Sequence, residues 1–372
     1  MNDNNYLLTN KEAISLLLII TINKIILNIP YTLVSTTSTG TFINLLFLLI
    51  ISFIILNIIL NLFKIFPSSD IIDISYFLGG NFLKIIISTL FIILFLVSSS
   101  ITLIDFCAML QIVYFKEFSK LYILLFFFIG IFVSNKLGFK SIINATGFII
   151  PFTIISIIIS LIGMNNTFEI SNFLPVFGKD FHTTFIKGFS NIFSLFIISY
   201  FLFLKPIIKK PDDYKKIVLR SFLLSFFLLL LATFPILNLY TNTNNSESIN
   251  FIYILSKNIK FGSFLNRVDA LFILLWTFCI LSYLSINTHI INTIFSKIFK
   301  VEEKNELTYL TLSILIILTI LPLNIPEINF IENIIYKILV ISMVIILPLI
   351  ILILSNIKLK KGSALWENIF IY

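Results

Sequence analysis

Apolar runs of about 20 residues recur along the chain, separated by short polar connections, and a helix of this length crosses ~30 Å of membrane hydrocarbon. The runs lack the alternation of barrel strands, so helices must satisfy their backbone polar groups in lipid. We therefore predict an all-α polytopic membrane protein. It forms a single integral membrane domain over 1–372, with about ten transmembrane helices at 13–34, 41–63, 83–106, 121–135, 142–163, 182–204, 217–239, 268–293, 307–323 and 334–356.

The composition supports this class and excludes others. The chain is 58% hydrophobic and only 12% charged, whereas soluble domains carry about 25% charged residues. It contains no paired-carboxylate motif, phosphate loop, metal-ligand spacing, or nucleophile with a matching base. We expect a protein that is not an enzyme and that holds no metal or cofactor.

The distribution of basic residues predicts the orientation. With ten spans, 17 of the 26 Lys and Arg residues fall on the side of the N-terminus and seven on the other side. Because cytoplasmic loops carry the excess of positive charge, both termini are expected to be cytoplasmic, with a cytoplasmic C-terminal tail at 357–372. The net charge of +8 therefore mostly reflects the basic residues of the cytoplasmic loops, and it gives no reason to expect binding to nucleic acid.

Ten spans divide into two halves of five, at about 13–163 and 182–356, which would have inverted topologies. Inverted repeats with discontinuous helices at equivalent places are typical of transporters. The equivalent spans are the first, which contains Pro30, and the sixth, which contains Gly188. We predict a helix break at each. The halves share no visible sequence identity, so the repeat rests on topology alone.

Lys24 is the most informative single residue because it lies near the middle of the first span. A charge at that depth costs roughly 2.5–3.5 kcal/mol on insertion scales, and such charges usually face a protein interior or a watery cavity. Lys24 could pair with a ligand carboxylate or replace a coupling ion; equally, it could snorkel or lose its proton. Asp105 lies about 10 Å toward the other side, which is marginal for a direct pair.

Other polar residues inside the spans are candidates to line the same pocket, although small and hydroxyl residues are also ordinary at helix contacts. The predicted ligand-binding set is Asn23, Lys24, Ile25, Ser98, Ser99, Thr102, Ser190, Asn191, Tyr283 and Asn287.

Two of the segments that connect the spans are expected to contain amphipathic structure. Residues 70–82 are expected to form a short cytoplasmic amphipathic helix, and the loop 241–266 contains an amphipathic piece at 249–260.

Four segments resemble the spore germination permease family, the B subunits of nutrient germinant receptors of endospore-forming bacteria. They are SYFLGGNFLK (75–84), NFLPVFG (172–178), KPIIKK (205–210) and NRVDALFILLW (266–276). Each segment alone is weak evidence for the family, but the segments occur in the family's order and spacing, and the resemblance covers about residues 10–356. The resemblance implies a ten-helix inverted-repeat (LeuT-like) fold of the amino acid/polyamine/organocation transporter superfamily, in the inner membrane of the spore.

The resemblance also implies a receptor complex with an A subunit and a lipoprotein C subunit. The B subunit would hold a small-molecule germinant, often an amino acid, in the transporter-type pocket. Relatives often have a glycine-rich stretch before the proline of the first span, where this chain has Asn23, Lys24 and the bulky Ile25. Lys24 would then supply the positive charge that exposed amides provide elsewhere. An autonomous amino-acid or ion permease and a scaffold with an empty pocket remain alternatives.

Overall fold

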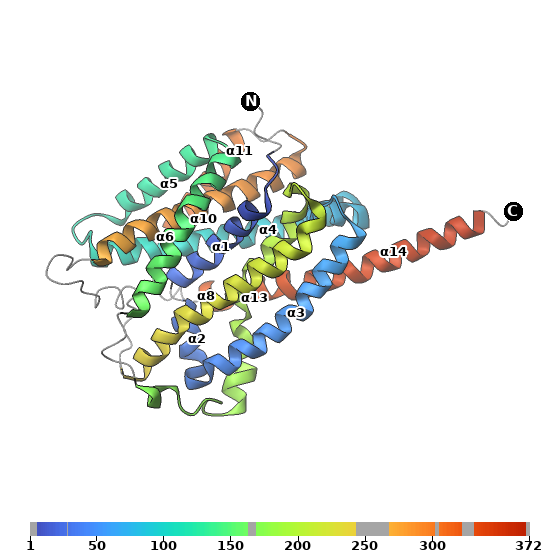
Figure 1. The fold of residues 1–372 in the computed structure, drawn as a ribbon. Helices are drawn as coiled ribbons and strands as arrows, with labels where there is room; N and C mark the ends of the chain where they lie inside the picture. The colour runs from blue at the N-terminus through green and yellow to red at the C-terminus, as the bar shows by residue number, and fades with distance from the viewer. Residues whose placement is uncertain are drawn as a thin grey trace.

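The computed structural model describes residues 6–27, 29–162, 169–242, 268–301, 305–321 and 331–369. Their secondary structure is helical, apart from an isolated bridge between Leu8 and Ile208. The main helices are α1 (Asn10–Ile26), α2 (Ile29–Thr37), α3 (Thr41–Ile65), α4 (Ile71–Val113), α5 (Lys120–Lys136), α6 (Phe139–Ile162), α7 (Ile197–Leu204), α8 (Tyr214–Asn242), α10 (Val268–Phe299), α11 (Asn305–Ile320), α13 (Lys337–Ile341) and α14 (Leu347–Ile369) (Figure 1).

Shorter irregular helices complete these elements. They are η2 (Ser38–Gly40), η3 (Ile170–Phe173), η4 (His182–Ile186), η5 (Lys187–Leu195), η6 (Lys205–Ile207), η7 (Pro211–Asp213), η8 (Ile331–Tyr336) and η9 (Ser342–Ile346). The amphipathic piece predicted at 249–260 and the first two residues of the 266–276 segment lie outside the described residues.

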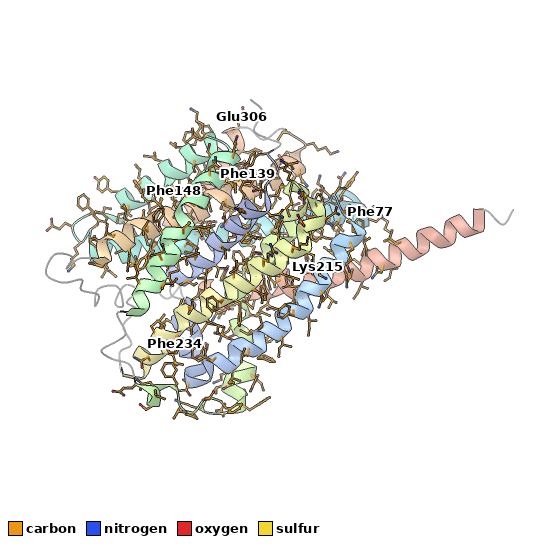
Figure 2. The ribbon with its side chains drawn as sticks, viewed as in Figure 1. Phe77, Phe139, Phe148, Lys215, Phe234 and Glu306 are labelled. Atoms are coloured by element: carbon orange, nitrogen blue, oxygen red, sulfur yellow. The ribbon has the colours of Figure 1, made fainter. Side chains whose placement is uncertain are left out.

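The chain is a multi-pass membrane protein. In the described part, six helices are long and apolar enough to cross a membrane, or seven if the bent pair around η5 and α7 is one span. Helices α1 and α5 are shorter, with 17 residues each, and α11 has 16. Large apolar side chains such as Phe148 on α6, which is 71% exposed, point away from the bundle (Figure 2). These side chains face the surrounding lipid.

Helix α1 lies at the centre of the bundle, where it packs against α6, α8 and α10 (Figure 1). Every residue from Leu16 to Ile26 is buried. A helix that is apolar on all sides has no preferred face and is stable only when it is surrounded. The start of α1 is set by a capping box, in which Thr9 and Glu12 exchange side-chain and backbone hydrogen bonds.

Backbone contacts fasten the start of α1 to the segment between α7 and α8. The Leu8 N–H donates to the Ile207 carbonyl at 2.7 Å, and the Lys209 N–H donates to the Leu8 carbonyl at 2.9 Å. The Asn10 amide also donates to Asp213 Oδ2 at 2.8 Å. The predicted equivalents, the first and sixth spans, are therefore joined at this end of the bundle.

The predicted amphipathic helix at 70–82 is the first part of α4. It buries Ile71, Ile72 and Ile74, and non-helical backbone at Gly79 and Gly80 separates it from the long apolar part of α4. Gly80 has φ 65°, a left-handed conformation that glycine adopts without steric cost. The Lys358 ammonium of α14 donates to the Phe77 and Leu78 carbonyls at 2.5 and 3.2 Å. A basic side chain therefore caps the carbonyls at the end of this short helix.

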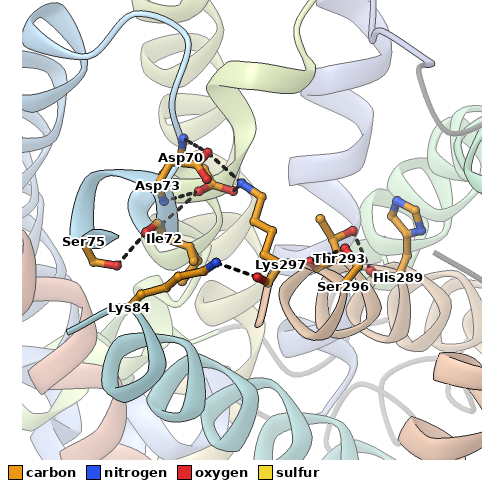
Figure 3. A network of polar contacts seen from close by, with 9 residues as sticks. All are labelled: Asp70, Ile72, Asp73, Ser75, Lys84, His289, Thr293, Ser296 and Lys297. Atoms are coloured by element: carbon orange, nitrogen blue, oxygen red, sulfur yellow. Dashed lines mark hydrogen bonds and ion pairs between the residues drawn. The ribbon is translucent and has the colours of Figure 1, made fainter. Parts of the chain in front are cut away.

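An ion-pair cluster holds the start of α4 against the end of α10 (Figure 3). Lys297 Nζ lies 2.6 Å from Asp70 Oδ2 and 2.7 Å from Asp73 Oδ2. Lys84 Nζ donates to the Lys297 carbonyl at 2.6 Å. Burial raises the pKa of the Asp70 carboxyl to about 6; the Lys297 ammonium opposes this rise and the Asp73 carboxylate adds to it.

Helix α14 continues through the predicted end of the last span as far as Ile369 and runs beyond the rest of the bundle (Figure 1). The residues predicted as a separate tail from 357 onward are thus largely an extension of this helix. Lysines 358, 360 and 361 stand where the helix leaves the apolar run.

Candidate functional site

Two helix breaks meet at the candidate site. Helix α1 ends at Ile26, and α2 begins at Ile29, directly before Pro30. Proline suits the start of a helix because its missing N–H has no partner there. The second break lies at Phe196, between η5 and α7, where the chain bends by 43°. Both breaks fall in the spans that the sequence predicts to be discontinuous.

The Lys24 ammonium lies at the end of α1, between these two breaks. The side chain is 4% exposed, and Nζ donates to Ser98 Oγ on α4 at 2.9 Å. Three aromatic rings surround the ammonium: their centroids lie 5.1 Å (Phe196), 5.7 Å (Tyr283) and 4.9 Å (Tyr336) from Nζ. Ring faces within about 6 Å attract a cation, so this cage replaces part of the lost hydration.

Ser98 connects the cage to two tyrosine hydroxyls. Its Oγ lies 2.6 Å from the Tyr283 hydroxyl and 3.5 Å from the Tyr336 hydroxyl. The site therefore combines side chains from α1, α4, α10 and η8 with the ring at the η5–α7 bend. We call Lys24, Ser98, Phe196, Tyr283 and Tyr336 the ammonium cage.

A second group of predicted residues lies beside the cage on the same helices. Asn287 Nδ2 donates to Ser99 Oγ at 2.9 Å, and the Tyr200 hydroxyl donates to Asn287 Oδ1 at 2.5 Å. Asn23 Nδ2 reaches Thr102 Oγ1 at 3.5 Å. Asn23 Oδ1 is buried and accepts no hydrogen bond from the described residues. A buried acceptor without a hydrogen bond costs free energy of folding, so Asn23 Oδ1 is a candidate to accept a hydrogen bond from a ligand.

The structure places Asn191 and Ser190 apart from these contacts. Asn191 bridges α2 and α3, because the Thr36 hydroxyl donates to its Oδ1 at 3.0 Å and its Nδ2 donates to Asn44 Oδ1 at 3.0 Å. The Ser190 hydroxyl donates to the Lys187 carbonyl of its own helix. Ile25 is fully buried in the apolar core. The predicted set thus divides into cage residues, a neighbouring network, a separate bridge and core packing.

Gly188 allows the broken sixth span to approach α3. A Cβ built there would collide with the Asn44 amide and lie 3.0 Å from Thr37 Cγ2. Gly188→Ala is expected to destabilise the folded protein by about 1–3 kcal/mol, since the Asn44–Asn191 bridge has to move. Thermal unfolding of the purified protein measures this effect. Gly147→Ala is the matched control, because open space surrounds Gly147; equal unfolding temperatures for both variants would contradict the prediction.

Sequence reasoning missed Phe196, Tyr200 and Tyr336. They lie among 42 Phe and 13 Tyr residues, most of them in apolar runs, and no local signal separates cage aromatics from packing aromatics. The half-buried polar ring of His289 on α10 stacks on Phe139, with ring centroids 4.2 Å apart. It therefore packs between α10 and α6.

A family model described as "Spore germination protein" matches residues 7–328. No curated protein sequence matches the chain. The matched range contains Lys24, Ser98, Phe196 and Tyr283, whereas Tyr336 lies after its end.

Proposed function

This chain belongs to the spore germination protein family, and we propose that it is the germinant-sensing B subunit of a spore nutrient receptor. The ligand in this proposal is a small amino acid. It binds at the ammonium cage, at the junction of the two broken helices. The observation that carries the proposal is a buried lysine ammonium together with a buried acceptor on the preceding residue, Asn23 Oδ1, that accepts no hydrogen bond from the described residues.

These two groups are complementary to a zwitterion. An ammonium is a strong hydrogen-bond donor to a carboxylate, and an amide oxygen accepts from an amino group. The surrounding rings and the buried helices exclude water, which strengthens a charge–charge contact. In this proposal the ligand carboxylate pairs with Lys24 and the ligand amino group donates to Asn23. As an alternative role in this proposal, Lys24 is a fixed cation in the place of a coupling ion, which predicts ligand binding independent of Na⁺.

The finer architecture belongs to the same proposal. Breaks in the first and sixth predicted spans, joined by the Leu8–Ile207 contacts, support two inverted repeats of five helices, ten spans in all, with cytoplasmic termini. The family supports a location in the spore inner membrane and assembly with an A subunit and a lipoprotein C subunit. Ligand binding between the breaks would change how the two broken helices pack, and the complex would read this change.

Spores that lack this chain are expected to lose germination with one class of single amino acids and to regain it on complementation. Loss of refractility across a panel of amino acids and salts measures the response. Binding of the same amino acids to the purified chain should show the same preference, with and without Na⁺. An unchanged germination profile in the deletion strain would contradict the proposal.

An autonomous amino-acid or ion permease is the second candidate, and the paired helix breaks favour it as well, since they are typical of transporters. Uptake by the purified chain alone in lipid vesicles would support the permease. A germination response that needs the neighbouring subunits, without uptake by the chain alone, would support the receptor.

A further inference from the structure

The first part of α4, residues 71–78, is a short helix with a hinge at one end and an ion pair at the other. Non-helical backbone at Gly79 and Gly80 separates it from the long apolar part of α4. At the opposite end, Asp70 Oδ2 lies 2.6 Å from the Lys297 ammonium of α10 (Figure 3). Hinges are a few residues that absorb a change in backbone angles, so this helix can turn as a unit. We call residues 71–78 the latch helix.

The ion-pair cluster at the far end of the latch helix contains two carboxylates and one ammonium. Asp73 Oδ2 lies 2.7 Å from the same Lys297 ammonium that contacts Asp70. When all three groups are ionised, one negative charge is in excess, and Asp70 is only 4% exposed. Burial of an uncompensated charge is unfavourable, and a single bound proton removes this charge. The geometry of the cluster therefore favours a proton while the latch helix is docked.

The other charged side chains on α4, α10, α11 and α14 near this end form no ion pair with Asp70 among the described residues. Lys84, beyond the hinge, donates to the Lys297 carbonyl. Lys358 of α14 contacts backbone carbonyls at the hinge end of the latch helix. Two exposed charges, on α10 and α11, are Lys300 and Glu306. The charges that act on Asp70 are thus those of Lys297 and Asp73.

Only one member of the cluster titrates between pH 5 and pH 8. Burial raises the pKa of Asp70 to about 6, although the Lys297 ammonium opposes the rise. Burial also acts to raise the pKa of Asp73, but the contacts with Lys297 outweigh it and hold this pKa below its ordinary value. Burial lowers the pKa of Lys297, but the two carboxylates outweigh it and raise this pKa above its ordinary value. Asp73 and Lys297 therefore stay charged while Asp70 gains or loses its proton.

We propose that Asp70 is a proton-binding site that controls the latch helix: a proton on Asp70 keeps the helix docked on α10, and loss of this proton to water favours its release about the Gly79 and Gly80 hinge. Asp73 gives water a route to the pair, since its side chain is 43% exposed. The buried side chains of Ile71, Ile72 and Ile74 keep the docked state in the majority, so the proton changes the population of a minor open state.

The size of the change follows from the two protonation equilibria. In the open state Asp70 faces water and has its ordinary pKa of 3.8, whereas the docked value is about 6. The docked state therefore binds the proton more tightly, and the equilibrium constant for opening rises about tenfold between pH 5 and pH 8. The latch joins α4 and α10, which also carry Ser98 and Tyr283 of the ammonium cage. It is separate from the cage and stands whether or not the cage binds an amino acid.

The test is hydrogen exchange of the full-length purified chain from pH 5 to pH 8 without a ligand, with rates corrected for the intrinsic effect of pH. Protection of the amides of residues 75–78 is expected to fall about tenfold in wild type. Asp70→Asn keeps an acceptor for the first turn and removes the titrating group, so its protection should not change with pH. Asp213→Asn is the matched control, because Asp213 pairs with Lys216 away from the latch and its loss should leave the fall unchanged.

A wild type whose protection at 75–78 is independent of pH would overturn the proposal, as would a wild-type fall in Asp70→Asn. An equal fall for the amides of α8 would also overturn it, because the effect would then be global unfolding. If Asp70→Asn does not fold, Asp73→Asn carries the test. This variant removes the carboxylate that helps to raise the pKa of Asp70, so the midpoint of the fall should move to lower pH; an unmoved midpoint would contradict the proposal.

Discussion

Spores that carry Lys24→Met in this chain are expected to lose their amino-acid response at a normal receptor level. The substitution keeps the apolar stem but removes the ammonium that lies 2.9 Å from Ser98 and within 5.7 Å of three ring centroids. Loss of one member of a buried charge pair with a ligand carboxylate costs at least about 2 kcal/mol, so binding should weaken roughly 30-fold or more. Germination assays and ligand binding to the purified variant measure the two effects.

The stability of the same variant separates sensing from folding. Replacing a buried charge with an apolar side chain of similar length is often neutral or stabilising. The unfolding temperature of Lys24→Met should therefore equal or exceed that of wild type. A lost response together with normal stability would place Lys24 in ligand or ion recognition.

Two further variants serve as controls for the first prediction. Lys337→Met removes another lysine of the membrane region, whose ammonium lies over Phe193 at 4.8 Å rather than in the cage; it should retain more of the response. Tyr336→Phe keeps the ring over Lys24 and removes only the hydroxyl, so a small effect is expected. An unchanged germinant preference in Lys24→Met would make the lysine a structural feature of the bundle.

The largest expected loss of stability comes from Lys297→Met. The substitution leaves Asp70, which is 4% exposed, and Asp73 facing each other without the ammonium that now contacts both at 2.6 and 2.7 Å. Removal of one partner of a buried ion pair destabilises a protein by about 3–5 kcal/mol. A fall in the unfolding temperature of the purified protein measures it. Lys300→Met, one turn further along and exposed, is the matched control and should have little effect.

The deficit of Lys297→Met should depend on pH in a defined direction. The pKa of Asp70 in the folded protein, about 6, lies above its ordinary value of 3.8. Protonation of Asp70 thus stabilises the fold fully below about pH 3.8, and this contribution is lost as the pH rises through about 6. Removal of Lys297 takes away the charge that opposes the rise, so the pKa of Asp70 increases further and the deficit is larger at pH 8 than at pH 6.

The double variant Asp70→Asn with Lys297→Met should recover much of the lost stability, because it removes the buried charge that the single variant leaves unpaired. A deficit that is independent of pH, and that Asp70→Asn does not relieve, would show that Lys297 acts through packing of its stem.

The sequence by itself determined the helical multi-pass class of this protein and its family. Apolar runs of membrane length predict the helical class, and the multi-pass class is confirmed. Pro30 in one span and Gly188 in another predict a break in each span, because a missing N–H donor and a residue without a side chain act locally. The bend in the second span lies at Phe196 instead of Gly188, which is inside η5, so its position was not predicted. The four family-like segments predict the family, which the match over residues 7–328 confirms.

The tertiary structure alone decided what surrounds Lys24 and which distant residues pair. Spans that are apolar on every side carry no periodic signal of their inward face, so nothing in the sequence separates Phe196 and Tyr336 from lipid-facing aromatics. Asn191 and Ser98 are both polar residues inside predicted spans, and the sequence predicts both as ligand-binding residues. Only Ser98 contacts Lys24, whereas Asn191 bridges α2 and α3. Lys297 and Asp70 are 227 residues apart in the chain, and only the packing of α10 against α4 brings them to 2.6 Å.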